Sequence, residues 1–550
     1  MSVIRFLFIL FLYASQVSAQ SIELVDYNVR LKALYRGGNN QTQPLNDPYG
    51  SFSSKNFTLI NKDNILEVFK SIDKCIFPSK AYLLSNLLGI DIDFSSCQKL
   101  SKYLEQTINS SILFGYVDPN VKSPMSYFGH GFIVFSNNLS PFSRTISYSA
   151  IIPNEISYFE LMKKGAIGEL EGRFTFNPLH LMFDQYLSVE QRNIYLYDLK
   201  FDEFENKLFR LQSYEIFHAT FDYHFFTQNC ASELLQLISS VKPELLDGMN
   251  KRDVIQPSQV VQLLKEYKLI DDVMLTKYSD LDSMFYANNE LKNENSGKNK
   301  NDIKSFIASK KADLYFKYFK KPLKNHLEYK SQPYLYEPDI KGLKQKPISD
   351  ISPNKIGIGF NEAHDKNNII VNYSPGLLKK NESRFSYLNE TTLQLLNISI
   401  AVTEDDVLLK RLDLLELESL NKITNDVVIP SWRFYIGYNQ NYGVFESPKR
   451  LVEFSYGYSV GGLNDILSFQ PQFSYNLSED AYALQANVSA SVWSDIGNFT
   501  VNYIPDLYQS KENKSRRTIF EYKTNFINSS QFNLVLSNHD FFTLGYSYRF

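Results

Sequence analysis

Apolar and polar side chains alternate along short segments from about residue 350 to the end of the chain. Alternate residues of an extended strand lie on one face, and an apolar face with aromatic ends is typical of a strand that crosses a membrane. About twelve such segments follow one another, separated by turn residues. The pattern predicts an antiparallel transmembrane β-barrel of about 12 strands over residues 350–550. On the last segment the alternate residues are Phe542, Leu544, Tyr546, Tyr548 and Phe550.

Three other segments show the same alternation, at Trp432 to Tyr438, Val452 to Tyr458 and Tyr482 to Ala486. A soluble β-sandwich is the alternative, because each strand signal is weak by itself. The aromatic residue at the carboxyl end, Phe550, favours the barrel, since it resembles the end of the closing strand that barrel-assembly machinery reads. We therefore expect a protein of the bacterial outer membrane, with membrane lipid and that assembly machinery as partners.

The amino-terminal end has the pattern of a secretory signal peptide. Arg5 precedes an apolar run from Phe6 to Ala14, and Val17 and Ala19 occupy the positions expected before a signal-peptidase site. We expect residues 1–19 to be removed. The apolar run is too short for a spanning helix, and no other stretch holds about 18 consecutive apolar residues. The mature chain is therefore expected to be exported, with its amino-terminal domains in the periplasm.

Between these two ends the chain divides into three regions. Residues 20–115 carry amphipathic helix patterns and form a predicted helical module. Residues 116–285 mix short strands with helices, which predicts an α+β domain. Residues 286–349 include a polar, Lys- and Asn-rich stretch and are expected to form a linker. The strands expected in the α+β domain are Gly131 to Phe135, Thr145 to Ile151 and Asn193 to Leu199, and its helices are Phe201 to Phe217 and Cys230 to Val241.

Composition narrows the functional classes. A net charge of -3 and a sequence pI near 6.2 give no electrostatic case for nucleic acid as a partner. Aromatic residues make up 15% of the chain, which suits sheets with aromatic girdles. The sequence contains no HExxH pattern, no CxxC pair and no P-loop glycine array, so we predict neither a metal site nor a cofactor.

Three cysteines define the candidate chemistry. Cys75 and Cys97 lie close in sequence, and an oxidising compartment favours a disulfide between them. Cys230 is then left as a single thiol. A lone thiol can be a small buried apolar residue, which is the structural alternative to a reactive group.

The surroundings of Cys230 favour the reactive alternative. Asn229 is a good amino-terminal cap, and the apolar positions that follow have helical spacing, so Cys230 is expected in the first turn of a helix. There the helix dipole and the backbone N–H groups stabilise a thiolate and can also bind an oxyanion. This placement is how papain-like thiol enzymes are built.

A reactive thiol needs a base, and His130 is the best candidate. It stands between Gly129 and Gly131, just before an expected strand, where the backbone can turn tightly and leave the imidazole accessible. His224, six residues before Cys230, is a minor rival. The remaining histidines are either expected to be structural or lie outside the domain; they are His180, His218, His326, His364 and His539.

At this point the chain resembles a known family, the Lnb amino-terminal periplasmic domain family. The resemblance covers roughly residues 60–265, and the region of Cys75 to Pro78 and Cys97 resembles the module that often precedes this domain. The matching segments, in the order of the family, are Ser123 to His130, Ile146 to Ala150, Gly165 to Phe174, Glu190 to Arg192 and Phe225 to Leu235.

The resemblance implies a circularly permuted papain-type or NlpC-type fold in which the histidine precedes the cysteine. Cys230 would be the nucleophile, His130 the base, and Asn229 and the Cys230 backbone N–H the oxyanion donors. The group that orients the histidine is left open between Ser147, Tyr148, Glu215 and Asp222. Of these four, Tyr148 and Asp222 rank slightly first.

Three functions follow from this reading. The first is a cysteine acyl-transfer enzyme that forms a thioester and acts on lipid or lipoprotein acyl groups, as members of the resembling family do. The second is an amidase or peptidase that cuts peptidoglycan peptides, as NlpC-type relatives mostly do. The third is a barrel protein without enzymatic activity, in which the periplasmic module and Cys230 are structural.

Overall fold

The structure is a computed structural model, and it describes residues 28–31, 44–48, 64–319 and 354–549 apart from short gaps. The expected signal peptide and the terminal Phe550 lie outside the described residues. The gaps are 109, 121–125, 127–128, 154, 226, 253–254, 293–298, 364–365, 376, 379–388, 404–405, 424–427, 440–448, 463–464, 478–479, 495, 510–515, 525–528 and 538–540.

Contacts within the chain divide it into two compact units. The helices expected in the amino-terminal module belong to the same unit as most of the α+β domain. Unit 1 comprises Met1–Val117, Phe128–Gln185 and Tyr195–Thr276, and unit 2 comprises Asp118–Tyr127, Tyr186–Ile194 and Lys277–Phe550.

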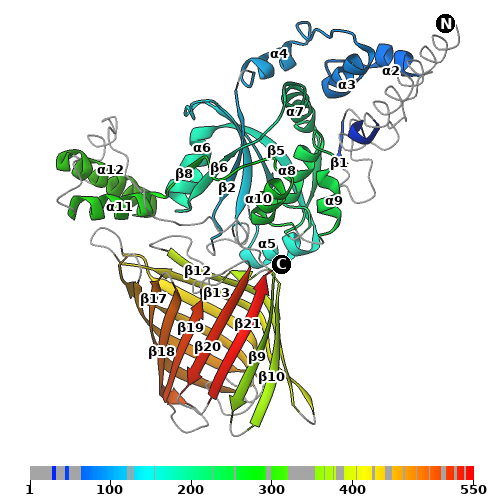
Figure 1. The fold of residues 1–550 in the computed structure, drawn as a ribbon. Helices are drawn as coiled ribbons and strands as arrows, with labels where there is room; N and C mark the ends of the chain where they lie inside the picture. Colours follow the sequence, from blue (N-terminus) through cyan, green and yellow to red (C-terminus); the bar gives the residue numbers. More distant parts are fainter. Residues whose placement is uncertain are drawn as a thin grey trace, which may run out of the picture. The chain divides into compact units, whose positions relative to one another are not determined.

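The α+β region contains one 8-stranded sheet with helices packed against it (Figure 1). Each strand and helix that the sequence predicted there is present, with its ends shifted by a few residues at most. In sheet order the strands are β1 (Pro44–Asn46), β7 (Thr220–Tyr223), β5 (Leu170–Pro178), β4 (Arg144–Ala150), β3 (His130–Phe135), β2 (Ile112–Val117), β6 (Ile194–Asp198) and β8 (Leu275–Lys277). The helices are α2 (Ile65–Ser71), α3 (Pro78–Leu88), α4 (Gln98–Glu105), α5 (Tyr158–Ile167), α6 (Leu179–Phe183), a π-helix (Asp184–Val189), α7 (Glu203–Ile216), α8 (Cys230–Ser239), α9 (Leu245–Asn250) and α10 (Pro257–Glu266).

The antiparallel register brings the ends of four strands together at one end of this sheet. The end of β7 lies beside the start of β5, because Leu170 pairs with Tyr223. The end of β4 lies beside the same part of β5, because Ala150 pairs with Gly172. Since β3 runs antiparallel to β4, it starts at this end of the sheet too. Helix α8 begins shortly after β7 ends, so Cys230 and His130 both lie at this end of the sheet.

A disulfide and buried polar contacts join the amino-terminal helices to the domain. Cys75 and Cys97 form the predicted disulfide. Ser79, in the first turn of α3, donates its backbone N–H and its hydroxyl to Glu215 Oε1, at 2.7 and 2.6 Å. Glu215, one of the four groups left open as the partner of the histidine, thus accepts hydrogen bonds from the first turn of α3.

Unit 2 contains the predicted barrel, a closed antiparallel sheet of 12 strands within the described residues (Figure 1). Closure comes from β9 pairing with β21 and from β10 pairing with β12, so the sheet has no free long edge. The strands are β9 (Lys355–Ala363), β10 (Lys366–Ser374), β12 (Asn389–Val402), β13 (Val407–Asn421), β14 (Ser431–Asn439), β15 (Lys449–Val460), β16 (Asp465–Asn476), β17 (Ala481–Ser494), β18 (Gly497–Gln509), β19 (Arg516–Thr524), β20 (Ser530–Ser537) and β21 (Phe541–Arg549), and the two-residue β11 (Leu377–Leu378) pairs with β12.

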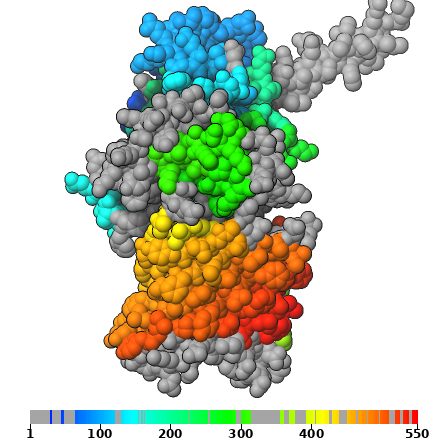
Figure 2. Space-filling view, turned by 90° about the vertical axis from the view of Figure 1, so that its left-hand side faces the viewer, coloured from blue at the N-terminus to red at the C-terminus, as the bar shows by residue number. Residues whose placement is uncertain are grey.

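The barrel is apolar outside and polar inside, the reverse of a water-soluble domain. On β16 the exposed positions include Leu467, Phe469 and Phe473, while the buried ones between them include Ser468 and Gln472. The closing strand repeats this arrangement, with Leu544, Tyr546 and Tyr548 exposed as predicted. Figure 2 shows one side of this outer wall in yellow to red. Such an inversion matches a strand between lipid and a polar lumen, and it argues against the sandwich alternative.

The region expected to be a linker contains two helices. Helix α11 (Asp280–Lys292) and helix α12 (Lys300–Phe319) pack on each other and share a small apolar core. Ile429, between β13 and β14, packs against that core. Most of that core comes from the two helices themselves, and Ile429 adds a contact from far away in sequence.

Ion pairs between strands fill part of the barrel lumen. Arg433 donates from Nη1 to Glu453 Oε2 at 2.9 Å and from Nε to Glu416 Oε1 at 3.1 Å. Both glutamates are buried. These contacts tie β13, β14 and β15 together from the inside.

Replacing Arg433 by leucine should weaken the barrel by about 3–5 kcal/mol, because it removes the nearest cation from two buried carboxylates. The temperature at which the barrel unfolds should fall. Tryptophan fluorescence reports this directly, since the only two tryptophans of the chain, Trp432 and Trp493, lie on barrel strands. Arg450→Leu, at an exposed position of β15, is the control. Equal unfolding temperatures for the two variants would contradict the assignment.

Candidate functional site

Cys230 is the first residue of α8, and its side chain is buried, with 4% exposed. Asn229 caps the helix as predicted: its Oδ1 accepts hydrogen bonds from the N–H groups of Ala231 at 2.8 Å and of Ser232 at 3.2 Å. Ser232 Oγ in turn accepts the N–H of Asn229 at 2.9 Å, which completes a reciprocal cap. The first helical turn is therefore firmly fixed around the thiol.

The amide nitrogen of Asn229 is used for structure. Nδ2 donates to the carbonyl oxygens of Phe225 and Ile255, both at 3.0 Å. Both amide hydrogens are thereby engaged, so Asn229 does not present a side-chain donor to an oxyanion in this structure. The other donor expected from the sequence, the Cys230 backbone N–H, is not used by this cap, because the cap bonds go to the next two residues.

His130 is the first residue of β3 and is buried, with 9% of its surface exposed. Its Nε2 lies 2.8 Å from the hydroxyl oxygen of Ser147 on β4. Gly129, just before it, has a φ of 93°, a backbone conformation that favours glycine. The group that the structure places on the imidazole is therefore Ser147, one of the four that the sequence left open.

Tyr148, which ranked first in the sequence together with Asp222, has other contacts. The Tyr148 hydroxyl donates to the backbone oxygen of Asp222 at 3.0 Å, and its ring stacks on Tyr223. A Cβ on Gly172 would lie 2.2 Å from that hydroxyl, so a glycine is required there. Tyr148 follows Ser147 on the strand and therefore points to the other face of the sheet. This alternation is the signal that could have separated the two.

The start of β3 packs against α8 at Leu234. A Cβ added to Gly131 would lie 3.1 Å from Leu234 Cδ1. Leu234 is four residues after Cys230, or about 6 Å along the helix axis. Alternation along β3 turns Gly131 toward α8 and the neighbouring His130 toward Ser147. Cys230 and His130 thus lie on two elements that pack on each other, α8 and β3, with the imidazole turned toward Ser147.

The other histidines of the α+β domain have structural surroundings. His224 forms a tight turn with Gln228 before α8. His218 packs edge-on against Tyr214, and burial, with a smaller contribution from Lys99, lowers its pKa. His180 Nδ1 lies 3.0 Å from the carbonyl oxygen of Pro141. His130 is therefore the histidine whose position fits the predicted base best.

The segment Glu190 to Arg192 stabilises the chain that leads into His130. Arg192 pairs with Glu190 at 2.6 Å, and its Nε donates to the backbone of Asp118. Glu190 Oε2 also accepts from the hydroxyl of Ser126 at 3.1 Å. These contacts give a physical reason for a charged pair at this place in the sequence.

The described residues contain no group of three or more His, Cys, Asp or Glu side chains that could hold a metal ion. Among the same residues, no helix is long and apolar enough to cross a membrane.

Asn229→Ala should open the corner around Cys230. It removes a helix cap worth about 1 kcal/mol and leaves two carbonyl groups unpaired, each costing about 1 kcal/mol or more. We expect Cys230, the one free thiol, to be alkylated at least about tenfold faster in the folded protein. Asn229→Asp keeps the cap, so its alkylation rate should lie between those of the wild type and Asn229→Ala. Asn138→Ala, in an exposed turn, should match the wild type, and so should Asn229→Ala if the cap does not hold this corner.

Two family models match parts of the chain. Residues 101–267 match the Lnb N-terminal periplasmic domain, and residues 352–540 match a domain of unknown function, DUF7840. No curated protein matches the chain. The first match spans both Cys230 and His130, and the second spans most of the barrel. Residues 101–267 are therefore matched by the family model of the Lnb N-terminal periplasmic domain, and the chain continues into a closed antiparallel β-barrel of 12 strands within the described residues.

Proposed function

We propose that this protein is a cysteine acyl-transfer enzyme of the outer membrane, with its catalytic domain in the periplasm and Cys230 as nucleophile. One observation carries the proposal: a thiol in the first turn of a capped helix lies on an element that packs against the strand of a buried imidazole, and a serine hydroxyl contacts that imidazole. Nucleophile, base and orienting group are the three parts of a thiol active site. Here they are Cys230, His130 and Ser147.

The two nitrogens of His130 would have different tasks. Nε2 faces the Ser147 hydroxyl, so Nδ1 is the nitrogen that would take the proton of the Cys230 thiol. A hydroxyl can donate or accept, and it therefore supports both the neutral and the protonated imidazole. Ser147 would keep the ring oriented while the charge of His130 changes during the reaction.

The reaction would pass through a thioester. The Cys230 thiolate attacks the carbonyl carbon of an ester, and the oxyanion that forms is held by the Cys230 backbone N–H at the positive end of the helix dipole. The tetrahedral species collapses, the C–O bond breaks, and protonated His130 gives its proton to the leaving alcohol. An amine that attacks the thioester yields an amide and returns the thiol, whereas water yields a free acid.

Lipid or lipoprotein acyl groups are the substrates that this architecture favours. The barrel holds the domain at a lipid surface, which raises the local concentration of an insoluble acyl donor. The apolar outer wall of the barrel supports that location. Peptidoglycan peptides remain the second candidate, since the same thiol chemistry also opens amides.

The direct test of the proposal is an acyl adduct on Cys230. Detergent-solubilised protein is incubated with phospholipid and measured by intact-protein mass spectrometry. We expect a fatty-acyl mass increment that hydroxylamine removes and that Cys230→Ala lacks. If no adduct forms and Cys230 also resists an alkylating probe, the thiol is structural and the proposal is wrong. An absent adduct on a reactive thiol would instead favour cell-wall peptides.

The role of Ser147 has its own signature. Ser147→Ala should slow acylation by about tenfold or more, because the imidazole loses its orientation. Its pH profile should also shift, since the hydroxyl no longer contacts the ring. Ser147→Thr keeps a hydroxyl and should restore most of the rate. Ser149→Ala, two residues further on the same face of β4, is the control and should behave as wild type. A rate unaffected by Ser147→Ala would exclude Ser147 as the orienting group.

A further inference from the structure

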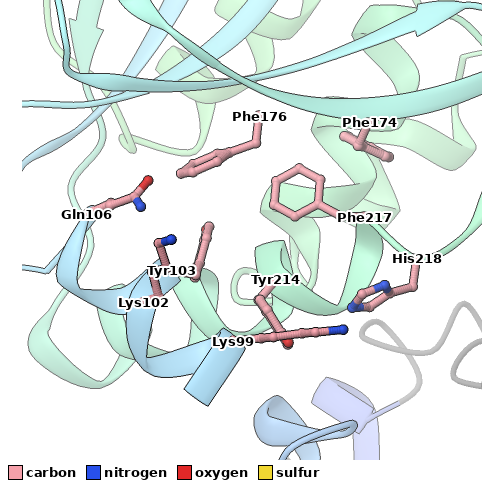
Figure 3. Close-up of a pocket in the computed structure, with 9 residues that line it drawn as sticks. All are labelled: Lys99, Lys102, Tyr103, Gln106, Phe174, Phe176, Tyr214, Phe217 and His218. Atoms are coloured by element: carbon pink, nitrogen blue, oxygen red, sulfur yellow. The ribbon is translucent and has the colours of Figure 1, made fainter. Parts of the chain in front are cut away.

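An open cavity of about 420 Å³ lies in unit 1 between α4, the end of α7 and β5 (Figure 3). It is lined by nine residues, most of them aromatic or basic, and none is acidic. Pockets of this size and lining commonly bind small molecules through apolar walls and a few polar groups. Neither the matched families nor the proposed reaction gives this cavity a role.

Helix α4 supplies the basic side of the cavity. Lys99, Lys102 and Tyr103 line it together with Gln106, the residue that caps the helix. Their spacing places them on one face of the helix. Both lysines are exposed. Within the part of the chain that the structure describes, neither lysine forms a salt bridge, so their charge is available to a ligand.

Aromatic rings form the floor of the cavity. The ring centroid of Tyr103 lies 5.0 Å from that of Phe176 and 6.0 Å from that of Phe217. Phe176 and Phe217 lie 5.6 Å apart. All three pairs are inclined, at 51°, 69° and 53°. Because no two of these rings face each other in parallel, the floor lacks a slot for a flat ligand and suits a flexible hydrocarbon chain.

The cavity is separate from the His130–Ser147 pair. Phe174 and Phe176, which line it, flank Thr175 on β5. Thr175 pairs with Ser147, and paired residues share a face of the sheet. Alternation therefore puts the two phenylalanines on the opposite face. A ligand in the cavity would not contact the imidazole or its serine.

The disulfide fixes the basic wall. Cys97 is the residue before α4, and it packs in one cluster with Leu100, Tyr103 and Leu211. A covalent bridge to Cys75 at the start of this short helix limits its motion relative to the segment before α3. Binding then costs less ordering of the wall, as expected of a preformed site.

We propose that this cavity binds a single-chain anionic amphiphile, a long-chain fatty acid, with its carboxylate on Lys99 and Lys102 and its chain on Tyr103, Phe176 and Phe217. Inorganic phosphate would use the lysines and gain nothing from the rings. A neutral lipid would use the rings and gain nothing from the lysines. Only a ligand with both parts uses both sides of the cavity.

The test is photo-crosslinking of the full chain in a nonionic detergent with a palmitic acid that carries a diazirine in its chain. Mass spectrometry then locates the labelled peptides. We expect label on α4, on β5 and at the end of α7, and we expect unlabelled palmitate to compete with it. Cys230→Ala should label equally, because the cavity does not depend on the thiol. The outcome is therefore distinguishable from that of the acyl-adduct experiment.

Variants separate the two halves of the proposal. Lys99→Glu with Lys102→Glu should reduce the label at least fivefold, whereas Lys163→Glu with Lys251→Glu, at exposed positions elsewhere in unit 1, should leave it unchanged. Lys99→Gln with Lys102→Gln, which only neutralises the charge, guards against misfolding of the reversed variant. Unchanged alkylation of Cys230 verifies that unit 1 is folded.

Three results would overturn the proposal. The first is wild-type label that lies outside these three elements. The second is equal labelling by the matching fatty alcohol, because the lysines would then select nothing. The third is label that persists in a folded Lys99→Gln, Lys102→Gln variant. Replacing Cys75 and Cys97 by serine should weaken labelling without abolishing it, since the wall becomes mobile while its side chains remain.

Discussion

The side chain of Asn229 is the contact on which the candidate site depends. Its oxygen caps α8, and its nitrogen joins the turn at Phe225 to the segment at Ile255. Each of these groups would otherwise be a buried donor or acceptor without a partner, which is costly. One residue thus fixes both the start of the helix and the chain on either side of it. The position of Cys230 follows from this, and so does the need for asparagine, because aspartate has no hydrogen to donate.

The barrel has an apolar outer wall and a polar lumen, as expected of a sheet that faces lipid. Lipid offers no hydrogen bonds, so every strand must pair on both sides, which the β9–β21 and β10–β12 pairings achieve. Polar side chains then have only the lumen, where they need partners of their own. Arg433 between Glu416 and Glu453 meets that need. The ion pairs inside and the aromatic rings outside are two consequences of one constraint.

The sequence predicted what depends on local periodicity and missed what depends on distant partners. Alternation predicted the barrel and its approximate number of strands, and the capping pattern predicted the start of α8. Alternation places Ser147 and Tyr148 on opposite faces of β4, but the sequence alone could not show which of these faces His130 shares. Nor could it show that residues 286–319 are mostly helical, because the apolar partner of α11 and α12 includes Ile429, more than a hundred residues away. The cavity was missed for the same reason: α4, α7 and β5 supply it jointly.

The cavity and the candidate site lie on two adjacent strands, β5 and β4. Phe174 and Phe176 face the cavity, and Thr175 between them donates its hydroxyl to the carbonyl oxygen of Ser147 at 3.3 Å. A strand moves as a whole, because its backbone is hydrogen-bonded to its neighbours on both sides. A ligand that displaces β5 from the cavity side therefore acts on the strand that carries Ser147. The effect on His130 would be one of orientation, through the Ser147 hydroxyl, while the cap at Asn229 holds Cys230 in place. This arrangement of contacts implies that a ligand in the cavity changes the orientation of the imidazole and leaves the thiol in place.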